Sequence, residues 1–190
     1  MQRGTGGLKE KEAFLLLLEL SAGRVLSYLF GPSWKGVFAP LFEEESTLFS
    51  FPHTLVLLQG DTILGMALGW GSNDRRAKGR RTLFQLLPYA LPRLFRFIPK
   101  VFYVGLPPSS YYLSNIAVFP PYQGKGFGRI LLQEVEKEAA RLGSASIILD
   151  VEKENIRALT FYRKNGYTPL REFPSFVRMA KPALEGRLCI

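Results

Sequence analysis

The chain has 190 residues, enough for one ordinary domain or for one domain with a sizeable insertion. Its composition, 47% hydrophobic and 22% charged, is typical of a folded globular protein and excludes a disordered tail. The single cysteine, Cys189, excludes an internal disulfide, and with the single histidine, His53, it offers too few ligands for a structural zinc site. We therefore expect chemistry that uses neither a metal nor a histidine-activated nucleophile.

The N-terminal segment is predicted to carry no secretion signal, because residues 1–8 are rich in glycine and hold no long apolar core. The densest early apolar run, residues 13–18, ends at Glu19. No stretch reaches the roughly 18–20 apolar residues that a membrane span needs. These features predict a soluble cytoplasmic protein.

The net charge of +9 is concentrated in one segment. Residues 72–100 hold eight basic residues against one acidic residue, a net charge of +7, so the rest of the chain is close to neutral. The charged residues of this segment are Asp74, Arg75, Arg76, Lys78, Arg80, Arg81, Arg93, Arg96 and Lys100. The basic character therefore needs a local explanation.

The first half of the chain predicts two helices followed by a β-hairpin. Apolar residues at helical density, then a Gly-Pro stop, indicate the first helix. Two apolar runs separated by Gly60-Asp61 indicate the hairpin, with His53 as a loop residue at its entrance. The expected elements are helices at 9–30 and 34–45 and strands at 54–59 and 62–70.

Residues 71–110 are predicted to form a basic and apolar insertion within the domain. Its stretch 83–98 has apolar residues at helical density. Pro88 and Pro92 lack the backbone N–H that a helix interior uses. We therefore expect several short helices there rather than one long helix.

The second half alternates strands and helices, an order typical of the α/β class, or α+β in some schemes. Gly143 is expected to end one helix, and Asn155 is expected to cap the next. The expected elements are a strand at 112–118, a helix at 129–142, a strand at 146–151, a helix between 155 and 166, and two closing strands within 167–181.

A glycine-rich loop, Gln123-Gly-Lys-Gly-Phe-Gly128, joins a strand to a helix in this half. Without Cβ atoms, a backbone can approach an anion closely, and the helix that follows adds its positive N-terminal end. The loop therefore indicates phosphate binding. No Walker motif is present, and the dinucleotide fingerprint fails because position 129 is arginine.

The pattern Gln123-x-x-Gly126-x-Gly128, placed after a strand that ends in Ile-Ala-Val118, resembles the central motif of the GNAT superfamily of acetyl-CoA-dependent N-acetyltransferases. The resemblance continues through residues 149–155 and 158–167, in the order strand, Asn, Ala, Tyr and Gly-aromatic. The family's first strand, before the first helix, is not evident. The resemblance implies one acetyltransferase domain over 1–190, with a mixed, mostly antiparallel sheet and helices on both faces.

The resemblance also implies the ligand sites. The loop amides would hold the pyrophosphate of coenzyme A, and the backbone of the preceding strand would pair with the pantetheine arm. Tyr162 would protonate the departing thiolate; helical geometry places it about 20° and roughly 10 Å from Asn155, so both can face one groove. The implied acetyl-CoA-binding residues are Ile116, Ala117, Val118, Gln123, Gly124, Lys125, Gly126, Phe127, Gly128, Arg129, Asn155 and Tyr162.

The reaction also needs a base for the substrate ammonium and a donor for the oxyanion. The Val118 N–H is the expected donor. Asp150 and Glu152 lie two positions apart on one side of a strand and are the expected catalytic carboxylates. Asp150 matches the base position of relatives that acetylate protein N-termini, although those carry Glu there. The alternatives are Glu43, Glu44 and Glu45.

The predicted function is transfer of an acetyl group from acetyl-CoA to a primary amine of a small molecule or protein, by direct attack and without a metal. The alternatives are a non-catalytic acyl-CoA-binding sensor, or an acetyltransferase that reaches a nucleic-acid- or ribosome-associated target through the basic insertion. The insertion also fits a lid, a membrane or dimer interface, or a packed excursion with a solvated face, which we favour. The amine, the base and homodimer formation stay open, and nucleic acid and membranes are the less favoured partners.

Overall fold

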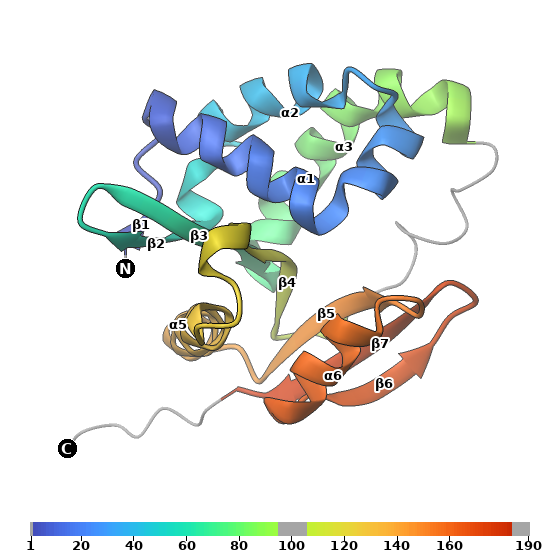
Figure 1. The fold of residues 1–190 in the computed structure, drawn as a ribbon. Helices are drawn as coiled ribbons and strands as arrows, with labels where there is room; N and C mark the ends of the chain where they lie inside the picture. The colour runs from blue at the N-terminus through green and yellow to red at the C-terminus, as the bar shows by residue number, and fades with distance from the viewer. Residues whose placement is uncertain (1, 95–105, 184–190) are drawn as a thin grey trace.

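The computed structural model of the chain describes residues 2–94 and 106–183, and of residues 90–94 only the backbone. Strands and helices alternate along most of it (Figure 1). In chain order the elements are β1 (Gln2–Arg3), α1 (Leu8–Phe30), α2 (Trp34–Glu43), η1 (Phe51–His53), β2 (Thr54–Gln59), β3 (Thr62–Gly71), α3 (Ser72–Leu94), β4 (Ser110–Val118), η2 (Pro120–Tyr122), α5 (Phe127–Arg141), β5 (Ser146–Glu152), α6 (Ile156–Lys164), β6 (Thr168–Glu172) and β7 (Phe176–Pro182).

The strands form one seven-stranded sheet in the order β1-β2-β3-β4-β5-β7-β6. Every neighbouring pair is antiparallel except β4 and β5, which run parallel. The predicted mixed, mostly antiparallel sheet is therefore confirmed. The first strand, which the sequence did not reveal, is β1, where Gln2 and Arg3 pair with Val56 and Leu55 of β2. A strand of two residues is too short to show the alternating pattern that would reveal it in the sequence.

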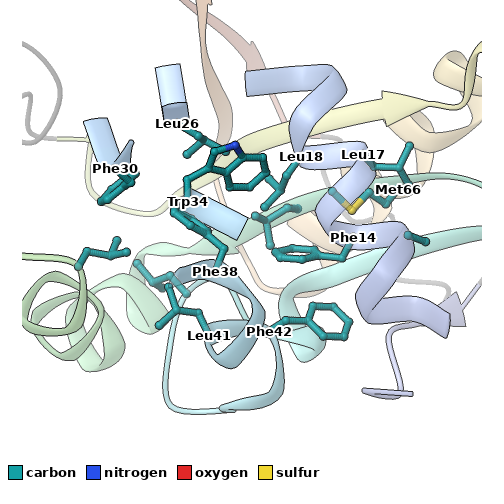
Figure 2. Packing of buried hydrophobic residues seen from close by; sticks show 14 of the residues in the cluster. Phe14, Leu17, Leu18, Leu26, Phe30, Trp34, Phe38, Leu41, Phe42 and Met66 are labelled. Atoms are coloured by element: carbon teal, nitrogen blue, oxygen red, sulfur yellow. The ribbon is translucent and has the colours of Figure 1, made fainter. Parts of the chain in front are cut away.

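Two hydrophobic clusters cover the sheet. The first joins α1, α2 and α3 to β2 and β3, and Figure 2 shows its tightly grouped aromatic and aliphatic side chains. Phe14 and Phe42 pack at 4.6 Å between ring centroids, and Trp34 is 2% exposed. The second cluster joins α5 and α6 to β4, β5 and β7. Helices on both faces of the sheet agree with the predicted architecture.

Helix α1 is long and apolar enough, by length and composition alone, to cross a membrane. The expectation that no segment reaches this threshold was therefore wrong for this helix. In the fold, Phe14, Leu17 and Leu18 of α1 are at most 1% exposed and belong to the first cluster. Its apolar composition thus supplies one side of the core, where burying each large side chain is worth about 1.5–3 kcal/mol.

Residues 72–94 of the basic segment form one long helix, α3, which continues through Pro88 and Pro92; residues 95–98 of the predicted stretch lie outside the described residues. The expectation of several short helices was wrong. Thr82 and Leu86 are buried and hold the helix to the body of the protein, where the Thr82 hydroxyl accepts a hydrogen bond from the Leu48 N–H at 2.9 Å. Pro88 and Phe84, four residues earlier, are both exposed. Water can therefore solvate the Phe84 carbonyl that lacks an N–H partner.

The predicted helix ends at Gly143 and Asn155 are confirmed. Gly143, at φ 67°, donates its N–H to the Ala140 carbonyl at 3.0 Å and ends α5. The Asn155 Oδ1 accepts the Ala158 N–H at 3.0 Å and caps α6. His53, expected in a loop, instead closes the short helix η1 and is 9% exposed. Its burial follows from contact with α3, whose path was not readable from sequence.

Candidate active site

A cavity of about 610 Å³ opens where β4 and β5 separate. Its walls come from α1, β4, the glycine loop, the end of β5 and α6. Figure 1 shows the elements that supply these walls, among them β4, β5, α6 and the loop before α5. The residues that line the cavity are Leu20, Ser21, Ala22, Val25, Ser114, Asn115, Ile116, Ala117, Val118, Tyr122, Gln123, Gly124, Gly126, Gly128, Arg129, Asp150, Val151, Glu152, Asn155, Arg157, Ala158, Phe161 and Tyr162.

The cavity exists because β4 leaves β5 partway along its length. The two strands pair only from Ser110 to Tyr112, although β4 continues to Val118. The register of β4 against β3 shifts between Leu113 and Asn115, which leaves Ser114 as a bulge. A bulge bends and twists its strand, which explains why β4 turns away from β5 at this point.

The separated half of β4 presents its backbone to the cavity. The Phe119 N–H donates to the Leu64 carbonyl of β3 at 2.9 Å. Because backbone groups alternate along a strand, the N–H and C=O of Ile116 and Val118 point the other way, toward the open side. The Val118 carbonyl there accepts a hydrogen bond from Gln123 Nε2 at 2.8 Å. The Val118 N–H on the same side is available to a ligand.

The glycine loop adds a second set of backbone donors. Gly124 and Gly126 adopt φ values of 78° and 87°, and a Cβ at either position would meet nothing within 4 Å. These glycines are therefore required by backbone conformation rather than by crowding inside the protein. Within the described residues, the amides of 124–128 have no protein acceptor. They lie at the N-terminus of α5, which favours an anion.

Tyr162 and Asn155, both on the α6 side of the cavity, lie as predicted. Tyr162 is 7% exposed and packs edge-on against Tyr167, with 5.6 Å between ring centroids. Burial raises the pKa of the Tyr162 hydroxyl, so it stays protonated through the neutral range. The side-chain oxygen of Asn155 is used by the helix cap.

The two predicted carboxylates differ in their surroundings. Arg178 of β7, whose side chain is 5% exposed, donates to both oxygens of Asp150 at 2.8 and 2.7 Å. The Tyr112 hydroxyl donates to the same carboxylate at 3.2 Å. Glu152 lines the cavity and is exposed, and its side chain makes no hydrogen bond to any described residue. Asp150 is thus held in an ion pair, whereas Glu152 is open to the cavity.

The remaining carboxylate candidates lie elsewhere. Glu43 pairs with Lys11 at 2.7 Å, and Glu44 pairs with Arg81 of α3 and accepts from Gln85. Hydrogen bonds from the Ser46 hydroxyl, which has the largest effect, and from Gln85 hold the pKa of Glu44 below its usual value. Neither these two residues nor Glu45 lines the cavity.

The structure gathers most of the predicted binding residues, and two lie apart. The Nζ of Lys125 lies 5.8 Å from the centroid of the Tyr122 ring, and Phe127 packs against the second hydrophobic cluster. Neither side chain lines the cavity. Sequence reasoning missed the wall that α1 supplies and the partner of Asp150. Ser21, a hydroxyl within an apolar helix, was the one local signal for the first. Arg178, a charge between two strand residues that are both buried, was the signal for the second.

Within residues 2–94 and 106–183, no three His, Cys, Asp or Glu side chains are grouped so that they could hold a metal ion.

The chain belongs to the acetyltransferase (GNAT) family, whose family model matches residues 24–167. The matched region includes the glycine loop, the open strand β4 and the capped helix α6. The predicted family is therefore confirmed, and with it the class of enzyme, an acyltransferase.

Two curated relatives are similar over part of the chain. The L-ornithine N5-acetyltransferase NATA1 of Arabidopsis thaliana is 35% identical over 63 residues, which are 33% of this chain and 28% of that protein. The ribosomal protein bS18-alanine N-acetyltransferase of Escherichia coli (strain K12) is 40% identical over 55 residues, 29% of this chain and 37% of that protein. The chain therefore spans only about a third of the length of these relatives.

Solved structures share the fold over nearly the whole chain. A crystal structure described as an acetyltransferase has a TM-score of 0.67 at 18% identity and covers 96% of this chain and 98% of its own. An acetyltransferase of Bacillus subtilis in complex with coenzyme A has a TM-score of 0.55 at 17% identity, with coverage of 96% and 97%. At these identities the likeness concerns the fold alone.

Proposed function

We propose that this protein transfers an acetyl group from acetyl-CoA to a primary amine by direct attack of the amine nitrogen. The observation that carries the proposal is the junction of two sets of backbone donors in one cavity. The amides of 124–128 face one end, and the open edge of β4 follows. An extended ligand with phosphates at one end and amides along its arm fits both, and coenzyme A has this chemistry.

Acetyl-CoA would supply the activated acetyl group as a thioester. The loop amides, Arg129 and the N-terminus of α5 would bind its phosphates. Ile116 and Val118 would pair with the pantetheine arm as a neighbouring strand does. The Val118 N–H would donate to the carbonyl oxygen as negative charge develops there, a role in which a preset backbone donor is effective.

Tyr162 would return a proton to the departing thiolate. Its protonated hydroxyl on the cavity wall is the form that an acid requires. Tyr162→Phe should lower turnover roughly 100-fold with little change in the dissociation constant of acetyl-CoA. Phe161→Leu, a change of the neighbouring wall residue that removes no hydroxyl, is the matched control. Unchanged turnover in Tyr162→Phe would remove the residue from the acid role.

Glu152 is the stronger candidate for the base, acting directly or through a water molecule. Its carboxylate oxygens are open to the cavity, whereas those of Asp150 are taken by Arg178 and Tyr112. A carboxylate at this end also favours an acceptor that arrives as an ammonium ion. Asp150 would then keep Arg178 and Tyr112 in place beneath the reacting groups.

The two carboxylates can be separated by pH–rate profiles. Glu152→Gln should flatten the acid limb of kcat/KM, whereas Asp150→Asn should lower activity and leave that limb in place. Glu154→Gln, an exposed neighbour outside the cavity wall, is the control. An acid limb that persists in Glu152→Gln and vanishes in Asp150→Asn would exchange the two roles.

A thiol-release assay tests whether the protein transfers acetyl groups from acetyl-CoA to amines. With acetyl-CoA and a panel of primary amines, including ornithine, polyamines and peptides with a free N-terminal alanine, the protein should release coenzyme A thiol only when an amine is present. Binding of acetyl-CoA without release on any amine would favour the sensor alternative.

A further inference from the structure

A second cavity, of about 150 Å³, lies apart from the candidate active site and shares no lining residue with it. It forms where β1, η1, β3 and β4 meet α3 and α5. Cavities of roughly this volume hold a molecule the size of benzene. Three cations and two carboxylates line this one: Arg3, Lys78, Arg141, Asp74 and Glu138.

One wall of this cavity carries two guanidinium groups on a single carboxylate. Arg141 donates to both oxygens of Glu138 at 2.8 and 2.9 Å, and Arg3 donates to the same carboxylate and to the Pro52 carbonyl at 3.0 Å. The Glu138 side chain is 13% exposed. Its acceptor positions are therefore occupied, and this wall keeps one excess positive charge.

The opposite wall carries Lys78, whose Nζ lies 3.1 Å from Nε2 of His53. An ammonium group can only donate, so Nε2 accepts and the imidazole is neutral. Burial first, and then Lys78, lowers the pKa of His53 to about 4. Lys78 forms no ion pair with a carboxylate in the described part of the chain. Two of its three N–H donors are therefore free to bind a ligand.

Tyr111 of β4 supplies a neutral donor between these walls. It is 2% exposed, and its hydroxyl makes no hydrogen bond to the described residues. The hydroxyl lies over Gly69 on the cavity wall, 2.8 Å from where a Cβ at Gly69 would stand. A hydroxyl on the cavity wall without a protein partner can donate to a ligand acceptor.

We propose that this cavity binds a small oxyanion, a carboxylate or phosphate group, through Lys78, Tyr111 and the two arginines. Donors outnumber free acceptors on its walls. The two arginines pair with Glu138, whereas Lys78 has no carboxylate partner among the described residues. Asp74 is the one carboxylate that opposes an anion. Its place in the first turn of α3, where a negative charge is favourable, accounts for its presence.

Calorimetric titration with inorganic phosphate and with acetate tests the proposal, and the two arms identify the preferred oxyanion. Ionic strength is held constant with sodium chloride, and each titration is run with and without coenzyme A, because phosphate can also reach the amides of 124–128. Lys78→Gln should weaken binding by about tenfold or more. Asp74→Asn should tighten it. Arg80→Gln, an exposed change on the same helix outside the cavity, should leave it unchanged.

Phosphate binding should also move the NMR titration of His53 to higher pH. The charged and titratable groups that face His53 are Arg3, Asp74, Lys78, Tyr111, Glu138 and Arg141.

Three results would overturn the proposal. Binding of neither anion would leave the cavity a water-filled cleft. Equal binding in wild type and Lys78→Gln would place the anion elsewhere. Binding of methylammonium that Asp74→Asn abolishes would assign the cavity to a cation. None of these outcomes depends on acetyl transfer, so the proposed function stands or falls separately.

Discussion

The only histidine of the chain should make its stability depend strongly on mildly acidic pH. His53 is 9% exposed, and its pKa falls from 6.5 to about 4 on folding. The unfolded chain therefore binds the proton more tightly than the folded protein. The free energy of unfolding is unaffected by His53 protonation above pH 6.5, and it decreases as the pH falls toward 4. Between about pH 7.5 and 4.5 the loss is about 2.5 kcal/mol.

Urea denaturation at both pH values measures this effect. His53→Gln keeps a side-chain acceptor for Lys78 but removes the titration, so its stability should fall by about 2.5 kcal/mol less than that of the wild type. Titrating groups that do not face His53, such as Glu44, are present in both proteins and cancel in the comparison. Equal pH dependence in the two proteins, or an NMR pKa near 6.5 for His53, would refute the reasoning.

Three further predictions concern close approach, the loop and the ion pair. Gly69→Ala should cost about 1–3 kcal/mol in urea denaturation, because a Cβ would lie 2.6 Å from the Tyr111 ring; unchanged stability would contradict that packing. Gly126→Ala, at φ 87°, should cost only about 1–2 kcal/mol of stability but weaken acetyl-CoA binding by about tenfold or more in calorimetry; Gly60→Ala, at φ 56° and outside the cavity, is its control, and unchanged affinity would argue against the loop site. Arg178→Met should destabilise the fold by about 3 kcal/mol, since it leaves Asp150 without its partner; a neutral result would mean that the ion pair contributes nothing.

The sequence was most informative where local chemistry dictates local structure. Gly124, Gly126 and Gly143 all adopt the left-handed backbone that favours glycine, and Asn155 caps its helix as its residue type predicts. The C-terminal half of the fold and the loop of the cavity were readable for this reason. No long-range information was needed to place these residues.

Features set by tertiary contact were not readable. Pro88 predicted a break in α3, but its exposed position lets water replace the lost hydrogen bond, so the helix continues. The Asp150–Arg178 pair depends on the register of β7 against β5, which brings these two residues opposite each other. The wall formed by Leu20 and Val25 depends on which face α1 turns to β4. Local signals such as Ser21 and Arg178 mark two of these places but do not identify the partner that each one meets.

A thermal-shift titration with acetyl-CoA tests the central claim most directly, with NAD and ATP as controls. At about 100 times the dissociation constant, binding should add about 2.7 kcal/mol, which raises Tm by about 5–10 °C for a protein of this size. The account predicts this shift with acetyl-CoA alone, and its loss in Gly126→Ala. No shift with acetyl-CoA, together with a shift on adding NAD or ATP, would contradict it.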